Sequence, residues 1–164
     1  MRFKNIFKNI FGYLLAFAVF VLLIPLLMWM ASGCVLPGVL WLICPLITAP
    51  VGMALSVWSI VHMKRVGKGN PMDAFNHEIA PRTKHLMTDG PYKICRNPML
   101  LGVFIYYAGI VVCLHTWQAA AIFAAFFAIM AVQVSREEKR LEKDFGDAYR
   151  EYKKKTRRLI PFVW

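Results

Sequence analysis

One arginine and one pair of glutamates stand on either side of a long apolar stretch of this 164-residue chain. Arg96 precedes the stretch, and Glu137 with Glu138 follows it. If the stretch folds as two antiparallel helices, the chain returns to the level at which it started, and these charges meet at one end of the hairpin. A planar guanidinium suits a carboxylate ligand, and a glutamate carboxylate suits an ammonium or a hydroxyl group. The arrangement predicts a site for a small zwitterionic molecule.

Neighbouring residues offer further contacts to such a molecule. Tyr92 and Tyr149 are candidates for an aromatic wall, and a helix that starts near Pro98 exposes unpaired backbone amides. Taken alone, Arg96 has a simpler interpretation as a basic residue that snorkels at the membrane edge. Glu137 by itself fits a solvated helix start, where negative charge is favourable. The combination across one hairpin favours the binding site.

The elements that must position these residues are apolar helices. Hydrophobic residues make up 59% of the chain, and uncharged apolar stretches cover residues 10–30, 36–63, 99–114 and 117–134. A stretch of about 20 apolar residues spans the hydrocarbon core of a bilayer. The sequence therefore predicts an all-α integral membrane protein with about four transmembrane helices and a cytoplasmic C-terminal amphipathic helix.

The basic residues predict how these helices are oriented. All 20 Lys and Arg residues fall within residues 2–8, 64–96 and 136–158, and the connections 31–35 and 115–116 contain none. Basic loops stay in the cytoplasm, so both termini and the central loop are expected there, with the helices crossing the cell (inner) membrane several times. The net charge of +11 then reflects topology, and nucleic acid is not expected as a partner.

The expected organisation is one membrane domain over residues 1–164. It comprises two N-terminal spans (1–63), a cytoplasmic loop (64–98), a helical hairpin (99–134) and a cytoplasmic C-terminal segment (135–164). Residues 1–8 are expected at the membrane interface, before an uncleaved anchor that is longer than the core of a signal peptide. Pro45 and Pro50 predict a kink in the second span.

Small residues predict the packing of the hairpin. Gly102, Ala108 and Gly109 are expected to face a fourth span that is rich in alanine. His115 and Thr116 form a minimal turn between the two helices. After residue 135, apolar and aromatic residues recur at helical spacing, and Glu137 and Glu138 border that stripe. These residues are Leu141, Phe145, Tyr149 and Tyr152.

Cysteine and histidine patterns argue against metal and disulfide chemistry. Cys34, Cys44, Cys95 and Cys113 contain no close pair, and Cys95 is expected to face a reducing cytoplasm. The central loop contains two histidines and three acidic residues without the spacing of metal ligands, so no metal site is expected. These residues are Asp73, His77, Glu78, His85 and Asp89.

The motifs taken together resemble the isoprenylcysteine carboxyl methyltransferase family, which is related to the phospholipid N-methyltransferases. The resemblance covers the C-terminal half and rests on Gly90-Pro91-Tyr92, Arg96-Asn97-Pro98, Gly102, Glu137-Glu138, Phe145-Gly146, Tyr149, Tyr152, Arg158, Ile160 and Pro161. Asn97 replaces the usual histidine, and Leu100 or Leu101 stands where a tyrosine is common. An asparagine can still form hydrogen bonds but cannot act as an acid or base.

The resemblance implies an enzyme that uses S-adenosyl-L-methionine. It implies Arg96 and Glu138 as catalytic residues, and a larger set as cofactor-binding residues: Tyr92, Arg96, Asn97, Pro98, Gly102, Glu137, Glu138 and Tyr149. The expected reaction is methyl transfer to a lipophilic acceptor, either the carboxylate of an isoprenylcysteine-like substrate or a lipid headgroup, at the cytoplasmic membrane face. The acceptor is expected to arrive from the bilayer between the helices.

Two alternatives remain open at this point. One is a membrane enzyme of the sterol-reductase type that uses NADPH. The other is a non-enzymatic membrane protein whose basic segments bind lipids or a partner. The basic run at residues 153–158 fits anionic lipid, although topological retention explains it equally well.

Overall fold

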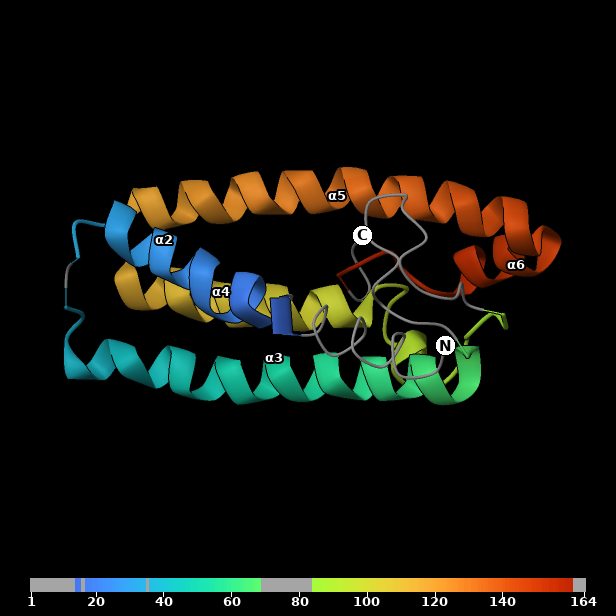
Figure 1. The fold of residues 1–164 in the computed structure, drawn as a ribbon, viewed down its shortest axis with the longest axis horizontal. Helices are drawn as coiled ribbons and strands as arrows, with labels where there is room; N and C mark the ends of the chain where they lie inside the picture. Colours follow the sequence, from blue (N-terminus) through green and yellow to red (C-terminus); the bar gives the residue numbers. More distant parts are fainter. Residues whose placement is uncertain (1–13, 16, 35, 69–83, 161–164) are drawn as a thin grey trace, which may run out of the picture.

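The computed structural model describes residues 14, 15, 17–34, 36–68 and 84–160. The main helices are α2 (Ile24–Ala31), α3 (Ile43–His62), α4 (Pro98–Leu114), α5 (Trp117–Phe145) and α6 (Asp147–Lys155). No strand occurs among the described residues. In Figure 1, α3 and α5 extend along the long axis on opposite sides, with α2 and α4 between them and α6 at one end.

Two helical segments are long and apolar enough to cross a membrane. One is Val39–Gly67, in which α3 is extended by a 3-10 turn before it and a π-helical turn after it, and the other is α5. Each has 29 residues, about 43 Å at ~1.5 Å per residue, which exceeds the ~30 Å of a hydrocarbon core. The other two apolar segments also form helices, but Ala18–Ala31 and Pro98–Leu114 are shorter.

Glycines bring α4 into backbone contact with α3. A Cβ atom at Gly102 would collide with the carbonyl oxygen of Gly52 and with Ser56 Oγ, and a Cβ atom at Gly52 would collide with the Gly102 carbonyl oxygen. Further along this α3–α4 contact, which we call the α3–α4 seam, a Cβ atom at Gly109 would collide with the Thr48 side chain. The prediction that these glycines face the fourth span is therefore wrong, because they let α4 approach α3 instead.

Aromatic side chains fill the space between α4 and α5. Phe104 packs edge-on against Phe126 at 5.9 Å between ring centroids, and Tyr107 lies 5.1 Å from the same ring. Met28 of α2 completes this core and is fully buried. Most of the alanines that were expected to contact α4 are instead exposed on the surface of α5. The exposed ones are Ala120, Ala121, Ala124, Ala125 and Ala128, whereas Ala119 is buried.

The two prolines of the second span leave α3 continuous. Pro45 lies in the first turn of α3, directly after the 3-10 turn Val39–Leu42. Pro50 lies inside the helix, which continues to His62. The helix is not interrupted at either proline, and the kink expected there stays a prediction.

The hairpin turn is formed as predicted, but the fourth span and the C-terminal amphipathic stretch are one helix. His115 adopts a left-handed conformation, and Thr116 caps α5 by accepting a 3.4 Å hydrogen bond from the Ala119 amide. α5 runs through residue 134 without a break and ends at Phe145. Gly146, with φ of +55°, then turns the chain into α6. The predicted interfacial segment 1–8 and the loop residues 69–83, including Asp73, His77 and Glu78, lie outside the described residues.

Candidate functional site

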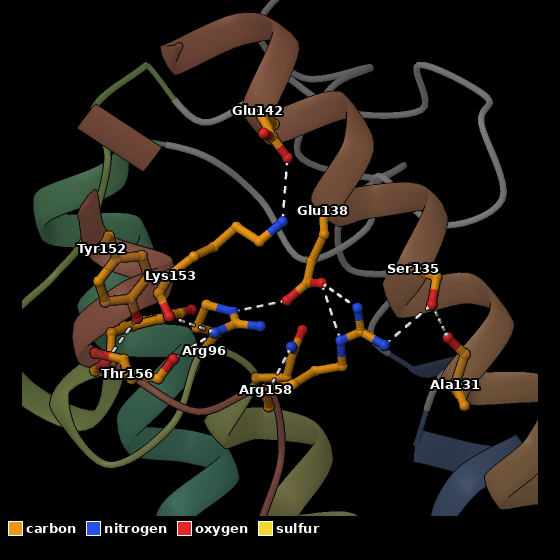
Figure 2. A network of polar contacts seen from close by, with 11 residues as sticks. Arg96, Ala131, Ser135, Glu138, Glu142, Tyr152, Lys153, Thr156 and Arg158 are labelled. Carbon is orange, nitrogen blue, oxygen red and sulfur yellow. Dashed lines mark hydrogen bonds and ion pairs between the residues drawn. The ribbon is translucent and has the colours of Figure 1, made fainter. Parts of the chain in front are cut away.

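The carboxylate of Glu138 joins two arginines that are distant in the sequence. Arg96 Nε donates to Glu138 Oε1 at 2.7 Å, and Arg158 Nε donates to Glu138 Oε2 at 2.9 Å. Figure 2 shows the carboxylate between the two guanidinium groups, which approach it from opposite sides. Of the glutamate pair that was predicted to meet Arg96, Glu138 contacts it, and Arg158 is an additional member of the cluster.

The three charges lie in a largely dry environment. The side chains of Arg96 and Glu138 are 9% and 5% exposed, whereas that of Arg158 is 27% exposed. Buried charges are stable only when their partners satisfy them, and Glu138 has a separate guanidinium for each oxygen. Among these three side chains two guanidinium groups face one carboxylate, and Arg158 is the most accessible of the three.

Arg96 also holds the end of the C-terminal helix. Its Nη1 donates to the carbonyl oxygens of Lys153, at 3.3 Å, and of Thr156. The last carbonyl groups of a helix lack intrahelical partners, and a guanidinium satisfies them well. Arg96 thereby connects α5, through Glu138, to the end of α6.

The chain after α6 runs alongside the residues before α4. The Arg96 amide donates to the Arg157 carbonyl oxygen at 2.8 Å, and Asn97 Nδ2 donates to the Arg158 carbonyl oxygen at 3.0 Å. Asn97 is the residue before α4, and Pro98 starts the helix, a position where proline costs no hydrogen bond. The asparagine thus holds the backbone of Arg158, which carries one of the two guanidinium groups on Glu138.

A cluster of tyrosines lies between the loop before α4 and α6. The Tyr152 hydroxyl donates to the Tyr92 carbonyl oxygen at 2.6 Å, and the Tyr149 ring lies 6.1 Å from the Tyr152 ring. Burial raises the pKa of all three phenols above the ordinary value, and the nearby charge of Glu137 adds to the effect at Tyr92. These hydroxyls stay protonated at neutral pH, and that of Tyr152 is the donor to the Tyr92 carbonyl oxygen.

A glycine and a histidine shape the start of this loop. Gly90 has φ of +55°, which favours glycine, and a Cβ atom there would come within 2.8 Å of the His62 ring. His62 Nε2 lies 2.8 Å from Asp89 Oδ1, and this contact is the main cause of a lowered pKa at Asp89. The end of α3 is thereby attached to the segment that carries Tyr92.

Most of the residues predicted for the site are brought together, with two qualifications. Glu137 is half-exposed and lies 4.0 Å from Arg140, outside the Arg96–Glu138–Arg158 contacts, although its charge acts on Tyr92 and Tyr149. Gly102 faces α3 and is separate from the charged cluster. The remaining residues line the junction of α4, α5 and α6: Tyr92, Arg96, Asn97, Pro98, Glu138 and Tyr149.

The network includes residues that were absent from the predicted site, among them Arg158, Tyr152 and Ser135. Arg158 and Tyr152 belong to the motif pattern and stood out in the sequence, but only a folded C-terminal segment brings them to Glu138 and Tyr92. Ser135 gave no signal in the sequence. It accepts a 3.3 Å hydrogen bond from Arg158 Nη1 and donates to the Ala131 carbonyl oxygen at 2.8 Å (Figure 2).

Known proteins resemble this chain over more than half of its length. A family model described as phospholipid methyltransferase matches residues 40–148, which include α3, α4, α5 and the glutamate pair. A protein-S-isoprenylcysteine O-methyltransferase of Schizosaccharomyces pombe is 30% identical over 94 residues, which are 55% of this chain and 40% of that protein. The chain thus covers less than half the length of that relative, and no solved structure matches it. The extent of the family match shows that the chain belongs to the phospholipid methyltransferase family.

Proposed function

We propose that this chain transfers a methyl group from S-adenosylmethionine to a lipophilic acceptor at the cytoplasmic face of a membrane. The observation that carries the proposal is the Arg96–Glu138–Arg158 cluster, which joins the two motif segments of a methyltransferase family at one end of an apolar helical bundle. The topology that goes with it has four spans, and both termini lie in the cytoplasm with the charged end.

The residues present fit the groups of the cofactor. A planar guanidinium suits the carboxylate of the cofactor, and Arg158 is the more accessible of the two guanidinium groups on Glu138. Half-exposed Glu137 would hold an ammonium or the ribose hydroxyls. Tyr92 and Tyr149 would provide the aromatic wall for the adenine.

The cofactor would supply an electrophilic methyl group on its sulfonium. The contribution of the chain to in-line transfer would be alignment and exclusion of water. Arg96 and Glu138 fix α5, α6 and the loop before α4 relative to one another, and the buried tyrosines keep this junction dry. A carboxylate acceptor requires no base, whereas an amine acceptor must lose a proton first.

The family match favours methyl transfer over the NADPH-dependent and non-enzymatic alternatives. The deciding experiment is calorimetry on detergent-purified protein with S-adenosylmethionine and, separately, NADPH. Saturable binding of S-adenosylmethionine alone is the expected result. The absence of binding at millimolar cofactor, in protein shown to be folded by circular dichroism, would refute the proposal.

Variants test the site itself. Arg96→Ala and Glu138→Ala should each weaken cofactor binding by about 2–5 kcal/mol, because each leaves a buried charge without its partner. Arg96→Lys should also be impaired, since a point charge cannot reproduce the fork of a guanidinium. Tyr152→Phe is the matched control, because it disturbs the same junction without changing its charge. Equal affinity in all variants would assign these residues a structural role only.

A further inference from the structure

A groove lies on the flank of α5, beside the candidate site. Its volume is about 360 Å³, and six residues line it: Ala131, Val132, Ser135, Arg136, Lys139 and Arg158. Val132, Ser135, Arg136 and Lys139 are spaced i, i+3, i+4 and i+7, so they share one face of the helix. Arg158 lines the groove and also donates to Glu138 and to Ser135, as the close view in Figure 2 shows.

The groove combines a cationic half with an apolar half. Arg136, Lys139 and Arg158 provide the positive charge, and Ala131 and Val132 provide the apolar surface. Within the described part of the chain, neither Arg136 nor Lys139 has an acidic side chain at ion-pair distance. Glu137 lies on another side of the helix, near Arg140, and Glu138 is shared by two arginines. The groove therefore has a surplus of positive charge.

The position of the groove on α5 coincides with the change from apolar to charged sequence. From Trp117 to Ser135 the helix has no charged residue, and Arg136 is the first. A helix that crosses a bilayer passes at such a point from hydrocarbon into the headgroup layer. A ligand in this groove would have its polar end among the cations and its apolar end along Val132, which is 54% exposed.

We propose that this groove binds the headgroup of one anionic phospholipid, with the phosphate between Arg136 and Lys139 and an acyl chain along Ala131 and Val132. An anionic lipid satisfies both halves of the groove at once. A soluble anion would leave the apolar half exposed, and a neutral lipid would leave the charge unbalanced. The proposal is independent of methyl transfer, since it requires neither cofactor nor turnover.

Native mass spectrometry of the protein in neutral detergent tests the proposal, with dioleoyl phosphatidylglycerol and dioleoyl phosphatidylcholine as probes. The parent should retain one phosphatidylglycerol in preference to phosphatidylcholine. The double variant Arg136→Ala/Lys139→Ala should bind it roughly 30-fold more weakly, because each basic residue near a membrane surface contributes about 1 kcal/mol. Equal retention of the two lipids by the parent would overturn the proposal.

Two further variants separate the groove from general surface charge. Lys93→Ala/Lys143→Ala removes two exposed lysines outside the groove, and should leave lipid affinity within about threefold of the parent. Val132→Trp fills the apolar half without changing the charge, and should weaken binding at least about tenfold. The groove would be ruled out as the site if the lysine control lost as much lipid affinity as Arg136→Ala/Lys139→Ala. It would also be ruled out if Val132→Trp bound the lipid as tightly as the parent. The thermal midpoint of each variant establishes that it is folded.

Discussion

The hydroxyl of Tyr152 donates a 2.6 Å hydrogen bond to the carbonyl oxygen of Tyr92, and both side chains are buried. The two residues are 60 positions apart, and one precedes and the other follows the α4–α5 hairpin in the sequence. This bond attaches α6 to the loop before α4, independently of the charged contacts of Arg96. The C-terminal helix is therefore held to the site by both a neutral and an ionic connection.

Replacing Tyr152 with phenylalanine should loosen α6. The Tyr92 carbonyl would lose its partner in a buried position, which costs about 1–3 kcal/mol. Trypsin should then cut more rapidly at Lys153–Lys155, near the end of α6. Tyr106→Phe is the matched control, because it removes a 3.2 Å bond to the Val21 carbonyl oxygen in another part of the bundle. The same cleavage rate in both variants would contradict a role for Tyr152 in holding α6.

Alanine at the glycines of the α3–α4 seam should destabilise the protein. At Gly52 and Gly102 the added methyl group meets backbone atoms of the facing helix, which cannot move aside independently. Overpacking of this kind costs about 1–3 kcal/mol or more, and the thermal midpoint in detergent should fall accordingly. Gly38→Ala is the control, since its nearest contact would be the Trp41 side chain at 3.7 Å. An unchanged thermal midpoint for Gly102→Ala would contradict the close packing of α3 against α4 at this position.

The α3–α4 seam also decides how bulky substitutions in the helices are interpreted as tests of lipid access. The sequence predicts that a lipophilic acceptor arrives from the bilayer between the helices, and bulky substitutions such as Gly109→Leu and Ala124→Phe would test that route. Gly109 instead meets Thr48 of α3, so its replacement tests helix packing, whereas Ala124 is exposed on α5. Ala124→Phe should fold normally, and Gly109→Leu should not, as measured by size-exclusion chromatography in detergent.

The thiol of Cys95 should resist alkylation. Burial raises its pKa to about 11, and the thiolate is the reactive form. At pH 8, N-ethylmaleimide should therefore modify exposed Cys34 rapidly and Cys95 only slowly, as followed by peptide mass spectrometry. In denaturant the two cysteines should react at similar rates, which controls for their intrinsic reactivity. Rapid modification of Cys95 in folded protein would show that the loop before α4 opens readily.

The sequence was sufficient to predict where the charges meet, because that depends only on connectivity. A two-residue turn forces α4 and α5 to be antiparallel, so Arg96 before one helix and Glu138 after the other must share an end. The partner of the glycine stripe could not be predicted in this way. Helical periodicity shows that Gly102 and Gly109 share a face, but it does not specify which neighbouring helix covers that face.

The contribution of Arg158 was beyond prediction for a different reason. It follows α6 in a segment without regular structure, and the preceding Thr156 is extended, with φ of −129° and ψ of 136°. Such a segment has no periodicity from which the direction of a side chain follows. Its path is fixed instead by hydrogen bonds from the Arg96 amide and the Asn97 side chain.

Substitutions of Glu138 and Arg158 should destabilise the protein to different extents. Glu138→Ala leaves two guanidinium groups without their carboxylate in a largely buried position, and breaking such a contact costs about 3–5 kcal/mol. Arg158→Ala should cost less, because Arg158 is 27% exposed and Glu138 keeps its bond to Arg96. The double variant Glu138→Ala/Arg158→Ala should be more stable than the sum of the two single losses indicates, since removing Arg158 also removes one of the unpaired charges. Thermal midpoints of the three variants in detergent measure this coupling, and strict additivity would mean that Arg158 and Glu138 do not interact in solution.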